Sequence, residues 1–158
     1  MSNVSLPRPR PIVAKRRFAL VASRFNSRYV EGLIDHATKE LSSLAPKASV
    51  SLHRVPGSFE IPIVARELAL RRKADAIIAI GVILKGKTDH AKNLSRSVTD
   101  ALQRIAVDLG VPIINVVLSL GSKSQARQRC LETKMNRGTE AARAAVAITK
   151  SLAELRRL

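Results

Sequence analysis

Apolar and polar residues follow one another along this chain in two alternating patterns. Three short, nearly continuous apolar runs, residues 18–22, 76–80 and 112–118, are typical of buried strands, and residues 50–55 predict a further short strand. Elsewhere apolar residues recur at three- and four-residue spacing, which predicts helices over residues 27–43, 61–70, 90–109 and 139–155, with a further helix beginning at Ser122. Strands that are apolar throughout and are joined by helices favour a parallel sheet covered on both faces. The pattern therefore predicts an α/β fold, a three-layer αβα sandwich with a four-stranded parallel sheet.

The chain divides into a short arm and one domain. Residues 1–16 contain Pro7, Pro9 and Pro11 in alternation with Arg8 and Arg10, which predicts an extended basic arm. Residues 17–158 are enough for a single domain with a sizeable core. No apolar run reaches the roughly 18 residues that cross a membrane, and no apolar signal core follows the basic start. With one cysteine, Cys130, we expect an intracellular, cytoplasmic protein without disulfides.

The excess of basic residues raises a further class of function. The chain has 28 Lys and Arg against 12 Asp and Glu, a formal net charge of +16, and such an excess attracts anions such as nucleic acid or phosphorylated metabolites. A nucleic-acid-binding protein is therefore one open alternative. Its candidate contacts would be Arg8, Arg10, Lys15, Arg16, Arg17, Arg71, Arg72, Lys73, Lys150, Arg156 and Arg157. These residues are spread over termini and loops, and no recognition motif or aromatic stacking platform accompanies them.

The candidate chemistry lies in the segments that follow the strands. Ligands of open parallel sheets bind outside the carboxyl ends of the strands, so the segments of interest are residues 23–26, 56–62, 81–90 and 119–124. Residues 81–88, Gly-Val-Ile-Leu-Lys-Gly-Lys-Thr, match the phosphate-binding pattern G-x-x-x-x-G-K-[ST] of nucleotide triphosphatases. The bulky interior of this match, and the lack of a later strand ending in a Mg²⁺-binding Asp, argue against that class. An anion site at the backbone of Gly86, Lys87 and Thr88, near a helix start, remains expected.

The same segments together resemble the lumazine synthase family. The most specific piece is residues 55–62, Val-Pro-Gly-Ser-Phe-Glu-Ile-Pro. Supporting pieces are Ser-Arg-Phe-Asn at 23–26, Gly86-x-Thr88-x-His90, Gln125 with Arg129, and Asn136-x-Gly138. The resemblance runs from about Phe18 to the final helix and implies a flavodoxin-like fold.

The resemblance also implies a reaction and its residues. A ribitylamino-uracil condenses with 3,4-dihydroxy-2-butanone 4-phosphate to give 6,7-dimethyl-8-ribityllumazine, a step of riboflavin biosynthesis, with neither a metal nor an organic cofactor. His90 matches the proton-transfer residue. Glu140 matches a carboxylate that orients it, and a solvated carboxylate at a helix start is an equal alternative for Glu140. Phe25 matches the aromatic that stacks on the uracil. The other implied uracil and ribityl contacts are Ser58, Phe59, Glu60, the backbone of Val82 and Ile83, and Asn115 from a neighbouring subunit. Of these, Phe59 is better explained by packing.

The phosphate of the second substrate is assigned to Lys87, Thr88 and Arg129, because a guanidinium suits an oxyanion. The chain departs from the family around this site: Ala91 replaces an aromatic residue, Lys87 and Asp89 are rare, and Ser119-Leu120 replaces a Thr pair. The family implies a homopentamer with active sites between subunits, and assembly into a 60-subunit shell stays open. Outside these motifs a histidine is usually structural, as we expect for His36 and His53.

Overall fold

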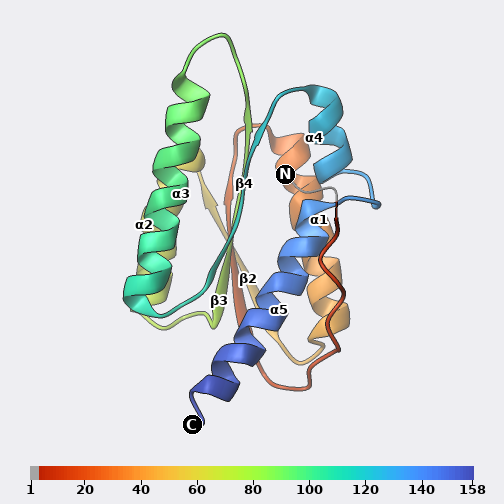
Figure 1. Cartoon of the computed structure of the whole chain (residues 1–158), viewed down its shortest axis with the longest axis vertical. Coiled ribbons are helices and arrows are strands. Elements are labelled where there is room, and N and C mark those ends of the chain that lie inside the picture. The colour runs from red at the N-terminus through yellow and green to blue at the C-terminus, as the bar shows by residue number, and fades with distance from the viewer. Residues whose placement is uncertain (1–3) are drawn as a thin grey trace.

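The structure is a computed structural model, and it describes residues 4–158. Strands and helices alternate through most of the chain, as Figure 1 shows. In order they are β1 (Arg17–Ser23), α1 (Ser27–Leu44), β2 (Ser49–Val55), a 3₁₀ turn η1 (Ser58–Glu60), α2 (Ile61–Leu70), β3 (Ala76–Leu84), α3 (His90–Leu109), β4 (Ile113–Leu120), α4 (Lys123–Cys130) and α5 (Arg137–Leu155).

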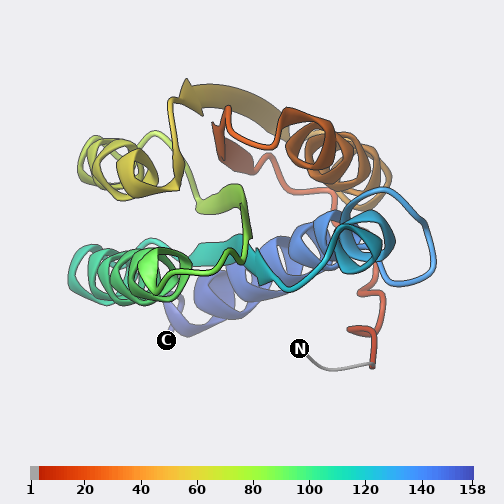
Figure 2. The same cartoon turned by 90° about the horizontal axis from the view of Figure 1, so that it is seen from above.

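The four strands form one parallel sheet in the order β2-β1-β3-β4. Helices α2 and α3 cover one face, and α1, α4 and α5 cover the other (Figure 2). This confirms the predicted three-layer αβα sandwich and its four-stranded parallel sheet. Strands β1 and β3 lie inside the sheet and are buried along nearly their whole length, which explains why these runs are apolar throughout rather than alternating.

The core is split by the sheet into two clusters. One face packs Leu33, Leu41 and Ile78 with their neighbours, and the other packs Ile61, Ile77 and Leu102. Helices α1 and α5 approach closely on the first face. A methyl group added at Gly138 of α5 would lie only 2.3 Å from Leu33 O of α1. On this face burial also raises the pKa of the Cys130 thiol to about 12, so its reactive thiolate form is scarce at neutral pH.

Element ends differ from the sequence prediction by two or more residues in three places, at the ends of β3 and β4 and at the start of α5. Strand β3 continues to Leu84 and β4 to Leu120, where we expected loops from Gly81 and Ser119. Both extensions arise because β3 and β4 pair with each other to their last residues, Leu84 opposite Leu120. Helix α5 begins at Arg137, two residues early, since the Asn136 side chain accepts from the Gly138 and Thr139 N–H groups. Helix α4 begins at Lys123 after Ser122, whose hydroxyl caps the Gln125 N–H.

The described part of the arm, residues 4–16, lies along α1 and α5 (Figure 1). Arg8 donates to Glu40 Oε1 at 3.2 Å and to Ser43 Oγ at 2.6 Å, while Arg143 donates to Glu40 Oε2 at 2.8 Å and to Leu6 O at 3.1 Å. Burial alone raises the pKa of Glu40, but the hydrogen bonds from Arg143 and Arg8 outweigh it and hold the pKa below its usual value. This carboxylate therefore joins the arm to both helices.

Candidate active site

The connections that follow β1, β2 and β3 meet at the carboxyl edge of the sheet. Pairing between β1 and β3 ends at Ala22 opposite Ile80, so the last residues of β3 project beyond β1. The segment after β2 returns to β1, because the Arg24 N–H donates to Val55 O at 3.0 Å and to Pro56 O at 3.2 Å. These bonds fix two of the four predicted segments beside each other, next to the projecting end of β3.

Phe25 and Glu60 lie together against Gly57. A methyl group placed on Gly57 would be 3.2 Å from Phe25 Cδ2 and 3.1 Å from Glu60 Oε2, so both side chains lie tightly against this glycine and would have to shift slightly around a larger residue. The Gly57 N–H donates to Glu60 Oε2 at 2.9 Å, which fixes the carboxylate. The Phe25 ring is 70% exposed. An exposed ring beside a fixed carboxylate can stack on a flat molecule while the carboxylate accepts its N–H or O–H groups.

The 3₁₀ turn η1 buries one of its side chains and exposes the next. Ser58 is buried against β3, since a methyl group at Gly81 would lie 2.5 Å from Ser58 Oγ and 3.3 Å from Ser23 Oγ. Phe59 points the other way and is 67% exposed. The interpretation of Phe59 as a packing residue is therefore wrong within this chain, because the tight turn buries Ser58 and turns the next side chain outward.

Asn26 ties the loop after β1 to the projecting end of β3. Its Nδ2 donates to Val82 O at 2.7 Å, and its backbone is left-handed with φ 56°. Asn26 is the N-cap residue of α1, yet its side chain makes no capping hydrogen bond. Backbone groups of successive strand residues face opposite edges, so Ile83, opposite Ser119, faces β4. Of the two predicted backbone contacts, Val82 is the one on the edge beside Phe25.

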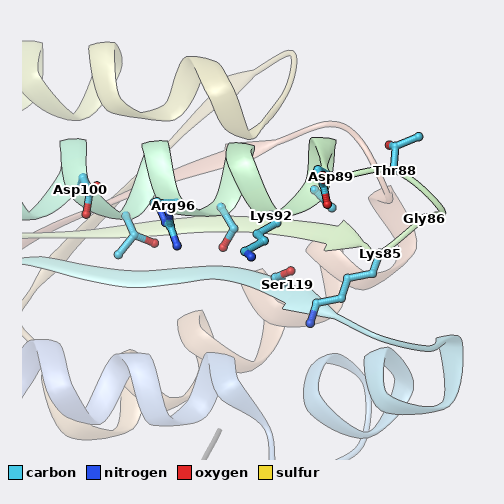
Figure 3. A pocket seen from close by; sticks show the side chains of 11 residues that line it. Lys85, Gly86, Thr88, Asp89, Lys92, Arg96, Asp100 and Ser119 are labelled. Atoms are coloured by element: carbon cyan, nitrogen blue, oxygen red, sulfur yellow. The ribbon is translucent and has the colours of Figure 1, made fainter.

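The loop after β3 borders a groove of about 620 Å³ between α3 and β4. In Figure 3, Lys92, Arg96 and Asp100 extend from α3 toward β4, and Lys85 reaches back toward Ser119. Thr88 lines this groove and Lys87 is exposed beside it. His90 is the first residue of α3 and is exposed.

The remaining predicted residues lie in other grooves of the same chain. Arg129 is 8% exposed and lines a groove of about 250 Å³ with Lys134. Asn115 and Glu140 border a third groove, of about 340 Å³, between β4 and α5. The Asn115 amide donates to Thr99 Oγ1 at 3.3 Å. No residue is shared between these three grooves, so one chain does not bring Arg129 or Glu140 to the groove that Thr88 lines.

Arg137 is a candidate that sequence reasoning missed. Its guanidinium forms an ion pair with Glu140 one helical turn later, and both side chains are largely buried. Glu140 was expected to orient His90, but in this chain its carboxylate is paired with Arg137. The signal available in the sequence was the i, i+3 spacing of Arg137 and Glu140 at a helix start.

The structure also decides against the nucleotide triphosphatase interpretation. Residues 81–84, the first half of the match, are strand residues paired with β4, so they do not form a loop around phosphates. Helix α3 begins at His90, as predicted, so Gly86, Lys87 and Thr88 lie in the loop before the helix, and Asp89 makes no side-chain cap. His36 and His53 make local contacts, with Leu131 O and Ser51 Oγ. Across residues 4–158, no group of three or more His, Cys, Asp or Glu could hold a metal ion.

Within the same described residues, no helix is both long enough and apolar enough to cross a membrane.

Comparison with known proteins shows which family this chain resembles. Residues 15–153 match the family model described as 6,7-dimethyl-8-ribityllumazine synthase. A protein of that name from Halorhodospira halophila is 37% identical over 140 residues, covering 88% of this chain and 90% of its own length. Another from Stenotrophomonas maltophilia is 34% identical with the same coverage. A solved GDP-L-fucose synthetase from Naegleria fowleri is similar only at a TM-score of 0.42 and 9% identity, over 99% of this chain and 49% of its own.

Proposed function

This chain belongs to the 6,7-dimethyl-8-ribityllumazine synthase family, and on that premise we propose how its residues carry out the family's reaction. The substrates are 5-amino-6-(D-ribitylamino)uracil and 3,4-dihydroxy-2-butanone 4-phosphate. The observation that carries the assignment of residues is the convergence of Phe25, Glu60 and Ser58 at the carboxyl edge, around Gly57 and Gly81.

The uracil lies on the Phe25 ring, with the backbone of Val82 along its edge, whereas the backbone of Ile83 faces β4. The ribityl hydroxyls extend toward Ser58 and Glu60 and past Phe59. Buried hydroxyls need polar partners, and the Glu60 carboxylate is already held by the Gly57 N–H. This arrangement fixes the reacting amine before the second substrate arrives.

The chemistry needs proton transfers and no electron transfer. The 5-amino group attacks the ketone and water leaves, forming an imine. Phosphate is then eliminated, the ribityl-bearing nitrogen attacks the resulting carbonyl, and a second water leaves as the ring closes. His90 accepts and donates the protons, a role worth roughly 10²–10⁴-fold in rate. A reaction of this kind requires no metal or organic cofactor.

The departing phosphate is held by Thr88, Lys87 and Arg129. Because Arg129 lies in a different groove of the chain from Thr88, we place it, with Asn115, Glu140 and Arg137, in the site of an adjacent subunit. This supports a ring in which each site is shared, a homopentamer. Glu140 then reaches the neighbour's His90 while Arg137 fixes its carboxylate.

The direct test mixes purified protein with both substrates and follows the lumazine absorbance. A well-folded protein that forms no lumazine would overturn the assignment. Sharing of the sites is tested by mixing two inactive variants, His90→Ala and Arg129→Ala. Random assembly of a ring leaves about one quarter of shared sites intact, so activity should return to about that fraction. If nothing returns after the subunits exchange, both halves of the site belong to one chain.

A further inference from the structure

The segments that precede the four strands, together with the end of α5 and the residues after it, converge at the amino edge of the sheet, opposite the candidate active site. They are residues 15–17, 45–49, 71–75, 108–112 and 154–158, at the lower end of Figure 1. Backbone hydrogen bonds connect them: Ser49 N–H donates to Arg16 O at 2.9 Å and Asp75 N–H to Arg17 O at 2.7 Å. We call these five segments the basic edge.

The basic edge concentrates the charge of the chain. Its segments hold nine Lys and Arg against three Asp and Glu. The connections at the carboxyl edge, residues 24–26, 56–60, 85–89 and 121–124, hold four against two. Basic residues that are scattered along the sequence are thus gathered at one end of the molecule. The potential of a surface depends on this spatial concentration rather than on net charge alone.

Three arginines of the basic edge are held in place by backbone carbonyl groups. Arg17 Nη1 donates to Arg72 O at 2.7 Å, Arg72 Nη1 donates to Leu109 O at 3.1 Å, and Arg156 Nη2 donates to Gly110 O at 2.7 Å. A carbonyl acceptor fixes a guanidinium but leaves its full charge, and each guanidinium has five N–H donors. Arg17 also forms an ion pair with Asp75 at 3.4 Å. Because these side chains are already ordered, they lose less conformational entropy when they bind an anion.

A small cavity of about 60 Å³ lies among these groups, lined by Arg16, Asp75, Thr149 and Arg156 with apolar neighbours. Arg16 Nε is buried and has no hydrogen-bond partner within residues 4–158. The Asp75 carboxylate is engaged by the Arg17 N–H at 2.7 Å. A phosphate oxygen at this cavity would satisfy the Arg16 N–H, whose burial without a partner is otherwise costly.

We propose that the basic edge binds the phosphodiester backbone of nucleic acid without reading its sequence. Guanidinium groups suit phosphate oxygens, and the five segments contain no aromatic residue on which a base could stack. The only exposed large apolar side chains among the described residues of these segments are Leu155 and Leu158, and residues 15–17 and 71–75 contain none larger than alanine, so most of the basic edge offers charge rather than the apolar face that inserts into a membrane surface. Binding is therefore electrostatic and falls steeply as salt is added.

The test measures fluorescence anisotropy of a labelled DNA duplex, titrated with the whole protein at several salt concentrations. Lys15, Lys47 and Lys73 are exposed lysines of the basic edge. Changing all three to Gln should weaken binding at least about tenfold at moderate salt and make the salt slope up to about 2.7 shallower, about 0.9 for each lost phosphate contact. A matched control, Lys39→Gln with Arg66→Gln and Lys123→Gln, removes the same charge elsewhere and should change affinity less than about threefold.

Arg72→Gly removes one fixed guanidinium at a position where glycine suits the backbone, because Arg72 has φ 52°. It should weaken DNA binding while lumazine formation stays unchanged. Equal effects of the two triple variants, or no binding by the unchanged protein at low salt, would overturn the proposal. So would binding to phosphatidylglycerol vesicles with none to DNA.

Discussion

Replacing Phe25 by alanine separates a ligand-stacking ring from a ring that merely packs. A phenylalanine that is fully enclosed buries about 200 Å². With the ring 70% exposed, about 60 Å² is already covered and about 140 Å² is open to a ligand. At about 25 cal/mol per Å² the fold loses about 1.5 kcal/mol in Phe25→Ala. A flat heterocycle covers one side of the ring, about half of the open area. Losing this contact in Phe25→Ala should weaken binding of the heterocycle by about 1.7 kcal/mol, or roughly 20-fold in affinity.

Steady-state kinetics measure this loss. We expect KM for the ribitylamino-uracil to rise roughly 20-fold, with KM for the butanone phosphate nearly unchanged, and Phe25→Tyr to restore binding because it keeps the ring. Ile63→Ala is the control, since this side chain on α2 is 68% exposed and is no part of the proposed site. An unchanged KM in Phe25→Ala, or the same rise in Ile63→Ala, would refute the reasoning.

Four further predictions follow from single contacts. Arg129→Ala should weaken inhibition by inorganic phosphate at least about tenfold. The control is Arg127→Ala, which should not weaken it, because Arg127 is exposed and paired with Glu132. Equal effects of the two substitutions would show that Arg129 does not bind the phosphate. Glu40→Gln should lower the free energy of unfolding by about 1–3 kcal/mol at neutral pH. Because the folded-state pKa of Glu40 is lowered, its stabilisation is complete above the unfolded pKa and is lost as pH falls through the folded one, so urea unfolding of the two proteins should converge in acid. Gly138→Ala places a methyl group 2.3 Å from Leu33 O and should cost at least about 1–3 kcal/mol, whereas Gly86→Ala, with nothing within 4 Å, should leave the melting temperature almost unchanged. Arg72→Gly should change stability by less than about 1 kcal/mol, because relief of the left-handed backbone offsets one lost hydrogen bond; a larger loss in chemical denaturation would show that the Arg72 contact holds α2 to α3.

Helix positions were the most predictable part of the fold. The predicted bounds of α2 and α3, residues 61–70 and 90–109, agree with the structure, because a helix is specified by residues three and four apart in its own segment. The strand ends were less predictable. Gly81–Leu84 is as apolar as the strand before it, but only pairing with Val117–Leu120 shows that the strand continues.

The candidate site divides in the same way. Residues 55–62 are contiguous, so the sequence by itself determined that Ser58 and Glu60 lie in one turn, and the order of strands and helices determined the layered sheet. Only the tertiary structure decided that Phe25 and Glu60 both lie against Gly57, that Phe59 is exposed, and that basic residues from distant segments gather at the amino edge. The physical reason is range: periodicity and turn chemistry act over a few residues, whereas strand order and packing between helices depend on contacts between segments far apart in the chain.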